Sequence, residues 1–132
     1  MSATNSILSL AARLLLGALF MVAGIRGALA FAGTAAYMGR LGFPLPEVAA
    51  ALTIAVEVGG SALLILGWKA RWAAWLLAIF AAFAAIMGHR FWQANAGQYT
   101  NELHHFFKDL AIAGGMLMIA VNGPGRLSVD RK

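Results

Sequence analysis

Residues 48–67 read VAAALTIAVEVGGSALLILG, a long apolar run that is interrupted near its middle by one ionisable residue, Glu57. A helix needs about 20 such residues to cross the hydrocarbon core of a bilayer. A carboxylate at this depth costs ~2.5 to 3.5 kcal/mol even on lenient insertion scales, so a chain that keeps one usually pairs it inside a helix bundle and uses it. The run therefore predicts a membrane-spanning helix in which Glu57 has a functional role.

Three further apolar runs accompany this one, at about residues 7–25, 71–89 and 106–122. Each contains a charged or imidazole group within it or at its end, as the 48–67 run does. Buried helices of a soluble protein would be shorter, and their companions would show amphipathic stripes. The prediction is an all-α fold of one domain over residues 1–132, a membrane four-helix bundle with short loops.

The connections between the runs differ in length and polarity. The turn at residues 67–71 is tight, so the two runs that it joins are antiparallel neighbours. Residues 26–46 form a longer link, and its first part, from Ala28 to Arg40, is expected to form a short helix at the membrane interface. Residues 93–105 are the most polar stretch of the chain and are expected to form an exposed loop.

The composition excludes a soluble domain. Of the 132 residues, 61% are hydrophobic and 11% are charged, whereas a soluble domain has about 25% charged residues. The 10 Lys and Arg residues against 5 Asp and Glu residues are scattered singly, which indicates contact with lipid headgroups and not nucleic-acid binding. Without cysteine the chain has no disulfide, thiolate chemistry or iron–sulfur ligation of its own, and His104 and His105 lack the carboxylate pattern of a metal site.

The first run has a second interpretation as a signal peptide. Arg13, the apolar stretch at residues 14–25 and the small residues around Ala28 and Ala30 imitate one. Arg26 lies between the apolar stretch and the supposed cleavage site, which argues against cleavage. The first run is therefore expected to remain as a membrane helix.

Basic residues near the ends of the runs predict the orientation in the membrane. With four spans, the N-terminus, the 67–71 turn and the C-terminus share one side. That side holds Lys69, Arg71, Arg126, Arg131 and Lys132, with Arg13 added if its side chain snorkels, whereas the other side holds Arg26, Arg40, Arg90 and Lys108. This small excess favours both termini in the cytoplasm.

Small residues at helix-contact spacing predict which faces of the helices touch, because they let two backbones approach closely. One such series runs along the 48–67 stretch and another along the next run; they are Ala51, Ala55 and Gly59, then Ala74, Ala78, Ala82 and Ala85. A compact bundle built on these faces would bury Glu57.

Depth along the helices decides which charges can meet Glu57. At 1.5 Å per residue, Glu57 lies roughly 14 Å below the outer end of its run. Lys108 lies in the outer part of its own run, and Arg26 and His89 sit at the same outer end. Glu57 is therefore expected to be buried and hydrogen-bonded to a basic group, with Lys108 and Arg26 the leading candidates and Arg13 approaching from the inner end. The alternative is a buried ion pair that only fixes helix register, although such pairs are poor stabilisers.

Short motifs run through all four apolar stretches. They are Arg13-Leu-Leu-Leu-Gly, Gly24-Ile25-Arg26, Glu57-Val-Gly-Gly with Gly67, Arg71-Trp-Ala-Ala, His89, Lys108 and the ending Gly123-Pro-Gly-Arg-Leu-Ser-Val-Asp130. With these motifs nearly the whole chain resembles the DoxX family of bacterial four-helix inner-membrane proteins. The ending is the most specific match, since the family commonly closes with a GxGxxSxD tail. Arg26 departs from the family pattern, because the family often has lysine at this position. A guanidinium is planar and donates several hydrogen bonds in a fixed geometry, whereas the ammonium of lysine acts as a point charge.

The resemblance implies a redox-associated membrane subunit. Family members are linked to thiosulfate:quinone oxidoreductase, and others to oxidative-stress complexes with soluble redox enzymes. No cofactor ligand set is visible, so a redox role would rest on a quinone held in the bundle or on a partner subunit. A quinone site needs an apolar cleft with a proton donor and acceptor near the quinone oxygens. Glu57, His89 and Lys108 are the candidate catalytic residues, and Arg26, Glu57 and His89 are the candidate quinone-binding residues.

Three classes of function therefore compete. The first is a quinone-linked subunit of an oxidoreductase, and the second is a membrane anchor or scaffold for soluble redox enzymes. The third is a pathway for a small solute or for protons, for which buried Glu and His side chains are usual parts. Quinone binding, retention of soluble enzymes without any quinone, and flux in proteoliposomes would distinguish the three.

Overall fold

The computed structural model describes residues 2–131, so Lys132, one of the basic residues of the tail, lies outside the described residues. Within these residues, five α-helices and one short 3-10 helix follow one another. They are α1 (Ala3–Leu29), α2 (Phe31–Arg40), α3 (Pro46–Leu66), α4 (Ala70–Gly88), η1 (Phe91–Gln93) and α5 (Tyr99–Asn122). Residues 2–131 contain no strand, and the prediction of an all-α fold is confirmed.

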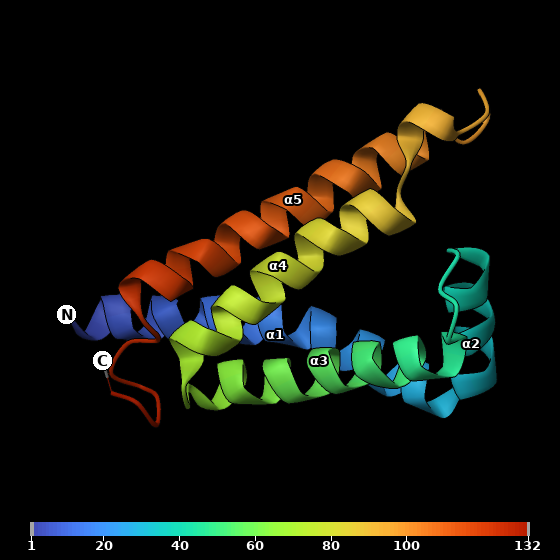
Figure 1. Ribbon diagram of the computed structural model, residues 1–132. Coiled ribbons are helices and arrows are strands. Elements are labelled where there is room, and N and C mark those ends of the chain that lie inside the picture. The colour runs from blue at the N-terminus through green and yellow to red at the C-terminus, as the bar shows by residue number, and fades with distance from the viewer. Residues whose placement is uncertain (1, 132) are drawn as a thin grey trace.

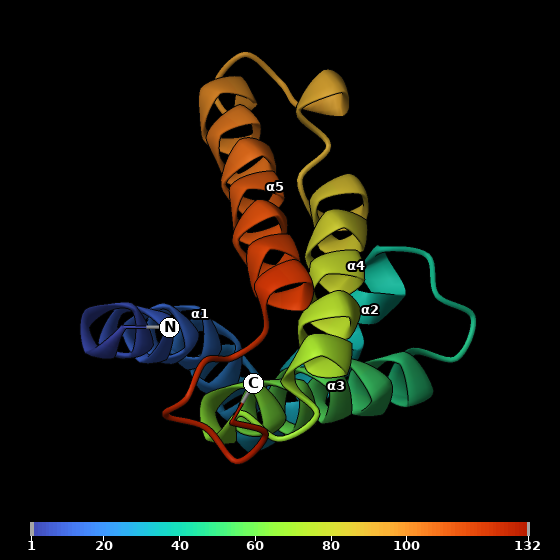
Figure 2. The ribbon, with the colours of Figure 1, turned by 90° about the vertical axis from the view of Figure 1, so that its left-hand side faces the viewer.

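The four long helices form two antiparallel pairs, α1 with α3 and α4 with α5 (Figure 1). The two pairs meet near the end that holds both termini and the turn between α3 and α4, and they diverge toward the other end (Figures 1 and 2). The short helix α2 lies across that far end, against α3. The molecule is therefore closely packed at one end and more open at the other.

The main hydrophobic core draws on all four long helices. Phe20 of α1, Leu64 of α3, Leu77 of α4 and Met116 of α5 are buried together. Gly60 lets α3 and α4 approach closely, because a Cβ atom at this position would lie 3.0 Å from the Leu77 side chain. Burial of such side chains against each other locks the two helix pairs at the end near the termini.

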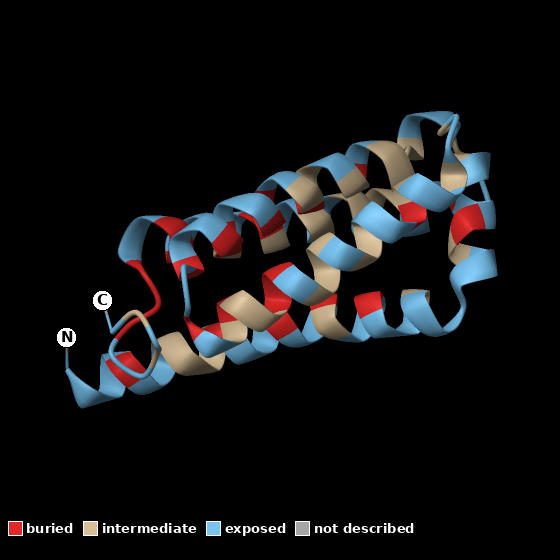
Figure 3. Ribbon diagram, turned by 60° about the horizontal axis from the view of Figure 1, so that its bottom comes forward, coloured by how far each residue is buried: buried red, intermediate tan, exposed pale blue. Residues whose placement is uncertain are grey.

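Three stretches are long and apolar enough to cross a membrane, namely α1, α3 and residues 70–93 with α4. Their outward faces carry large exposed apolar side chains such as Leu15 and Ile79, and Figure 3 shows exposed residues along the outside of the helices. Helix α5 packs along α4 but carries charged residues in its first half. Length and composition thus support three of the four expected spans.

The expected exposed loop at residues 93–105 is in large part wrong, because α5 begins at Tyr99. Asn95 explains the early start. Its side-chain Oδ1 accepts a hydrogen bond from the backbone N–H of Gln98 at 3.0 Å, and its carbonyl accepts one from the N–H of Tyr99. Such an Asx turn satisfies backbone donors ahead of the first helical turn.

A short helix does occupy the link after the first long helix, as predicted, although α1 continues to Leu29 before it. The hydroxyl of Thr34 stabilises the bend between α1 and α2, since its single proton is shared between the carbonyls of Gly27 and Ala30. This bend brings α2 over the open end of the molecule (Figure 1).

Arg13 has a different role from the predicted one, because it neither snorkels nor approaches Glu57. Its side chain is fully buried and donates to the carbonyls of Leu64 and Ile65 at the end of α3 and to those of Pro124 and Leu127 in the tail. The carbonyl end of a helix is the negative end of its dipole, so a cation is favourable there. Arg13 therefore holds the C-terminal tail against the end of α3.

The tail also caps the start of α4. Lys69, the residue before α4, has φ 49°, and its own side chain does not cap the helix. The Asp130 carboxylate caps it instead, because it accepts hydrogen bonds from the backbone N–H groups of Lys69 and Ala70, both at 2.9 Å. Gly67 has φ 73°, and a Cβ atom there would lie 2.2 Å from Cβ of Ser128. Arg13, Gly67 and Asp130 thus form one junction between the C-terminal tail and the turn that joins α3 to α4. This junction explains the motifs at Gly67 and in the tail.

Candidate functional site

The open end of the molecule contains a cavity of about 560 Å³, lined by residues of α1, α2, α3 and α4. Three of the residues predicted from the sequence line it, namely Arg26, Glu57 and His89. The rest of the lining is largely apolar and aromatic, with Tyr37, Thr34 and Thr53 as further polar groups. The structure therefore brings the predicted quinone-binding residues to one cavity.

Helix α3 presents Glu57 to this cavity at a place where α1 approaches it closely. A Cβ atom on Gly24 would lie 2.6 Å from the Val58 side chain and 3.0 Å from Cβ of Glu57. Only a residue without a side chain fits such a contact. The close approach also sets Arg26, two residues further along α1, beside the same cavity.

Glu57 is only half-buried, and the expectation that it is hydrogen-bonded to a basic group is wrong. Within residues 2–131 the ion pairs join His89 to Glu102 and to Asp109, and no hydrogen bond of the described side chains involves the Glu57 carboxylate. The reason is the splay of the two helix pairs, which leaves open space in front of this residue. The carboxylate is available to a molecule in the cavity.

Lys108 is exposed and is absent from the described lining of the cavity. Adjacent residues on a helix point about 100° apart, and α5 turns Asp109 inward instead. Lys108 is therefore not the partner of Glu57, and its predicted catalytic role gains no support from its position.

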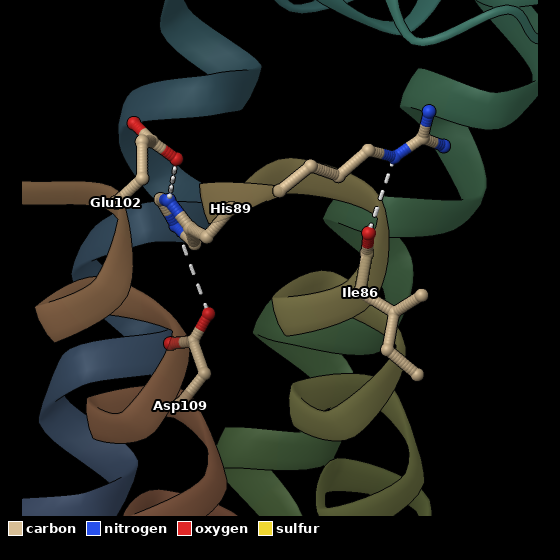
Figure 4. Close-up of polar contacts among 5 residues, drawn as sticks. Ile86, His89, Glu102 and Asp109 are labelled. Carbon is tan, nitrogen blue, oxygen red and sulfur yellow. Dashed lines mark hydrogen bonds and ion pairs between the residues drawn. The ribbon is translucent and has the colours of Figure 1, made fainter. Parts of the chain in front are cut away.

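His89 directly follows the last residue of α4. It lines the cavity and also contacts two carboxylates of α5. Its Nδ1 lies 3.0 Å from Oε2 of Glu102, and its Nε2 lies 3.7 Å from Oδ2 of Asp109. Figure 4 shows the imidazole between these two carboxylates. The ring of His105 stacks on that of His89, with the centroids 5.0 Å apart. The imidazole therefore has a carboxylate beside each of its two nitrogens.

The sequence reasoning missed Glu102 and Asp109 as functional candidates. A signal was present, because residues 102, 105 and 109 follow the i, i+3, i+7 spacing of one helical face. The prediction of a loop over residues 93–105 concealed this spacing.

Tyr37 supplies a phenol on the α2 side of the same cavity. Its hydroxyl lies 2.9 Å from the position that a Cβ atom on Gly88 would take. Desolvation raises the pKa of Tyr37 above its ordinary value, and the carboxylates of Glu102 and Asp109 raise it further. The phenol is therefore protonated near neutral pH and can donate a hydrogen bond.

A smaller polar pocket of about 270 Å³ lies behind His89 and is lined by Arg40, Arg90 and Glu102. It shares Leu41, Met87 and Gly88 with the main cavity. Glu102 thus faces this pocket while it is bonded to His89, which faces the cavity. In the described part of the chain, no group of three or more His, Asp or Glu side chains is arranged to hold a metal ion.

Comparison with known proteins gives consistent matches. The family model described as DoxX matches residues 8–90. Inner membrane protein YphA of Escherichia coli (strain K12) is 33% identical over 130 residues, which cover 98% of this chain and 93% of that protein. Inner membrane protein YqjF of the same organism is 37% identical over 125 residues, covering 92% of this chain and 88% of that protein.

A more distant similarity reaches a eukaryotic protein. The ER-derived vesicles protein ERV29 of Saccharomyces cerevisiae is 29% identical over 80 residues, covering 61% of this chain and 26% of that protein. No solved structure matches this chain.

Proposed function

Because this chain belongs to the DoxX family and is an integral protein of the bacterial inner membrane, we propose that it is a quinone-linked membrane subunit whose cavity holds a quinone ring. The observation that carries the proposal is the shared cavity of Arg26, Glu57 and His89. An apolar pocket with a few convergent polar groups is the usual form of a small-molecule site.

The cavity suits a quinone in size and chemistry. Its volume of about 560 Å³ lies within the ~300 to 1,000 Å³ of typical ligand pockets. Phe80 and Phe83 offer flat apolar surfaces to a ring, and Arg26, Tyr37 and His89 offer hydrogen-bond donors to two carbonyl oxygens. The Glu57 carboxylate is an acceptor for a quinol hydroxyl.

His89 and its carboxylates provide the proton chemistry that such a site requires. A quinone takes up two electrons and two protons when it becomes a quinol. Glu102 exchanges a proton with His89 across 3.0 Å, and His89 presents its ring to the cavity. The polar pocket behind Glu102 is the side from which water reaches this pair. Electrons would come from a soluble redox enzyme or partner subunit.

The proposal includes the orientation in the membrane. Helix α5 is the fourth span, α2 lies at the interface, and both termini are cytoplasmic, so the cavity lies near the outer leaflet. We expect reporter fusions at residue 97 and after residue 132 to report opposite sides, with the second in the cytoplasm, because four spans return the chain to its starting side. Reporters on the same side would contradict the fourth span.

The binding test uses the purified protein in lipid nanodiscs and decylubiquinone as the probe. We expect saturable binding that Arg26→Met weakens by about ten-fold or more, since a hydrogen bond to a charged group contributes ~1.5 to 3 kcal/mol. Arg126→Met is the matched control, because Arg126 is exposed in the tail at the opposite end.

The other two classes of function predict different results. A scaffold would retain soluble redox enzymes but bind no quinone, and a transport pathway would show flux in proteoliposomes with no effect of quinone. Unsaturable partition of decylubiquinone, unchanged by Arg26→Met, would exclude the quinone site.

A further inference from the structure

A second space lies beside the cavity, an apolar groove of about 380 Å³ between the first half of α3 and α4. The α3 side of this groove includes Val48, Leu52 and Val56, which recur every four residues and so follow one helical face over about 12 Å. Thr53 contributes the one side-chain polar group among the residues that line it. The groove therefore suits an apolar occupant.

The groove and the cavity share four lining residues, Phe43, Thr53, Phe80 and Phe83. The rings of Phe43 and Phe83 lie 6.4 Å apart between their centroids, and together these side chains form the boundary between the two spaces. Val48 and Leu52 are 52% and 62% exposed, so the groove opens on the outer face of the bundle. The groove is thus adjacent to the cavity, and only these shared side chains lie between the two spaces.

We infer that the molecule bound in the cavity carries a long apolar chain, and that this chain lies in the groove along Val48, Leu52 and Val56. The inference rests on the proposed function and narrows its substrate class to prenylated or long-alkyl quinones, as opposed to water-soluble ones. A ring with such a chain enters sideways from the bilayer, because the chain stays in apolar surroundings throughout while the ring passes Phe43 and Phe83.

The test uses a ubiquinone analogue with a decyl chain that carries a photoreactive diazirine near its middle, bound to the full-length protein in nanodiscs. We expect light to attach the chain to residues 48–56, as located by mass spectrometry, and an excess of unlabelled decylubiquinone to suppress this attachment. Uniform labelling of all lipid-facing helices that decylubiquinone does not suppress would show that ordinary lipid chains fill the groove, and would overturn the inference.

Two variants sharpen the comparison. Leu52 lines the groove but not the cavity, and Leu52→Trp fills part of the groove. We expect this variant to reduce the labelling of residues 48–56 to the level that remains when excess decylubiquinone is present. Leu15→Trp is the matched control, because Leu15 is 77% exposed on α1 and lines neither space. Labelling that is equal in both variants would contradict the groove assignment.

Failure of this inference is distinguishable from failure of the proposed function. If the ring binds and Arg26→Met weakens its binding while the chain labels no particular helix, the quinone site stands and the groove assignment falls. If decylubiquinone shows no saturable binding, both fall.

Discussion

Replacing Arg13 by methionine is expected to destabilise the protein by ~3 to 5 kcal/mol, because each buried carbonyl that loses its donor costs ~1 to 3 kcal/mol. The guanidinium donates to four carbonyls, those of Leu64, Ile65, Pro124 and Leu127. Methionine fills a similar volume but donates no hydrogen bond, so these acceptors lose their partner. The measurement is thermal unfolding in detergent, together with the rate of tryptic cleavage at Arg126.

Two further variants separate the hydrogen bonds from the charge. Arg13→Lys keeps the charge but has a single nitrogen in place of the fork, so we expect it to recover little of the stability. Asp130→Ala removes the cap of α4 and is expected to loosen the same tail at a smaller cost of ~0.5 to 2 kcal/mol. A stable Arg13→Met protein with a protease-resistant tail would show that the junction does not depend on this residue.

The largest functional effect is expected from Glu57→Gln. The carboxylate has no ion-pair partner among the described residues, so the amide breaks no salt bridge, and removal of a half-buried charge leaves thermal stability unchanged or raises it. Glutamine keeps the shape but transfers no proton, and loss of a general acid or base typically costs ~10²- to 10⁴-fold in rate. Function should therefore be lost from a protein that still folds.

The readout is complementation of a deletion strain, scored as its sensitivity to oxidants or sulfur compounds, beside thermal stability in detergent. Glu47→Gln is the matched control, because Glu47 lies in the first turn of the same helix and is exposed. Full complementation by Glu57→Gln would assign a structural role to the carboxylate and favour the scaffold function.

The family motifs identified in the sequence separate into two groups in space. Arg13, Gly67 and Asp130 form the junction at the end near the termini. Gly24, Arg26 and Glu57 lie together at the cavity, where the missing side chain of Gly24 allows α1 to approach α3. The spacing along the chain does not separate these groups, because each helix contributes residues to both ends of the bundle.

The predicted contact faces show why the packing was harder to predict than the helices. Ala74, Ala78 and Ala85 are buried as expected, but Ala51, Ala55 and Gly59 are exposed. The buried face of α3 instead contains Ala50, Gly60, Ser61 and Leu64. A lipid tail is as apolar as a leucine side chain, so an apolar helix has no polar stripe that marks the face turned toward its neighbours.

The sequence by itself determined the all-helical fold, the presence of a carboxylate within an apolar helix and the tight turn between α3 and α4, because these depend on the residues of one local stretch. Only the tertiary structure decided which charges meet. The rotation of α5 turns Asp109 inward and leaves Lys108 exposed, the splay of the helix pairs leaves Glu57 beside a cavity, and the folded tail takes Arg13 away from it. Each of these depends on how the helices rotate and cross, which is set by side-chain packing between segments distant in the sequence.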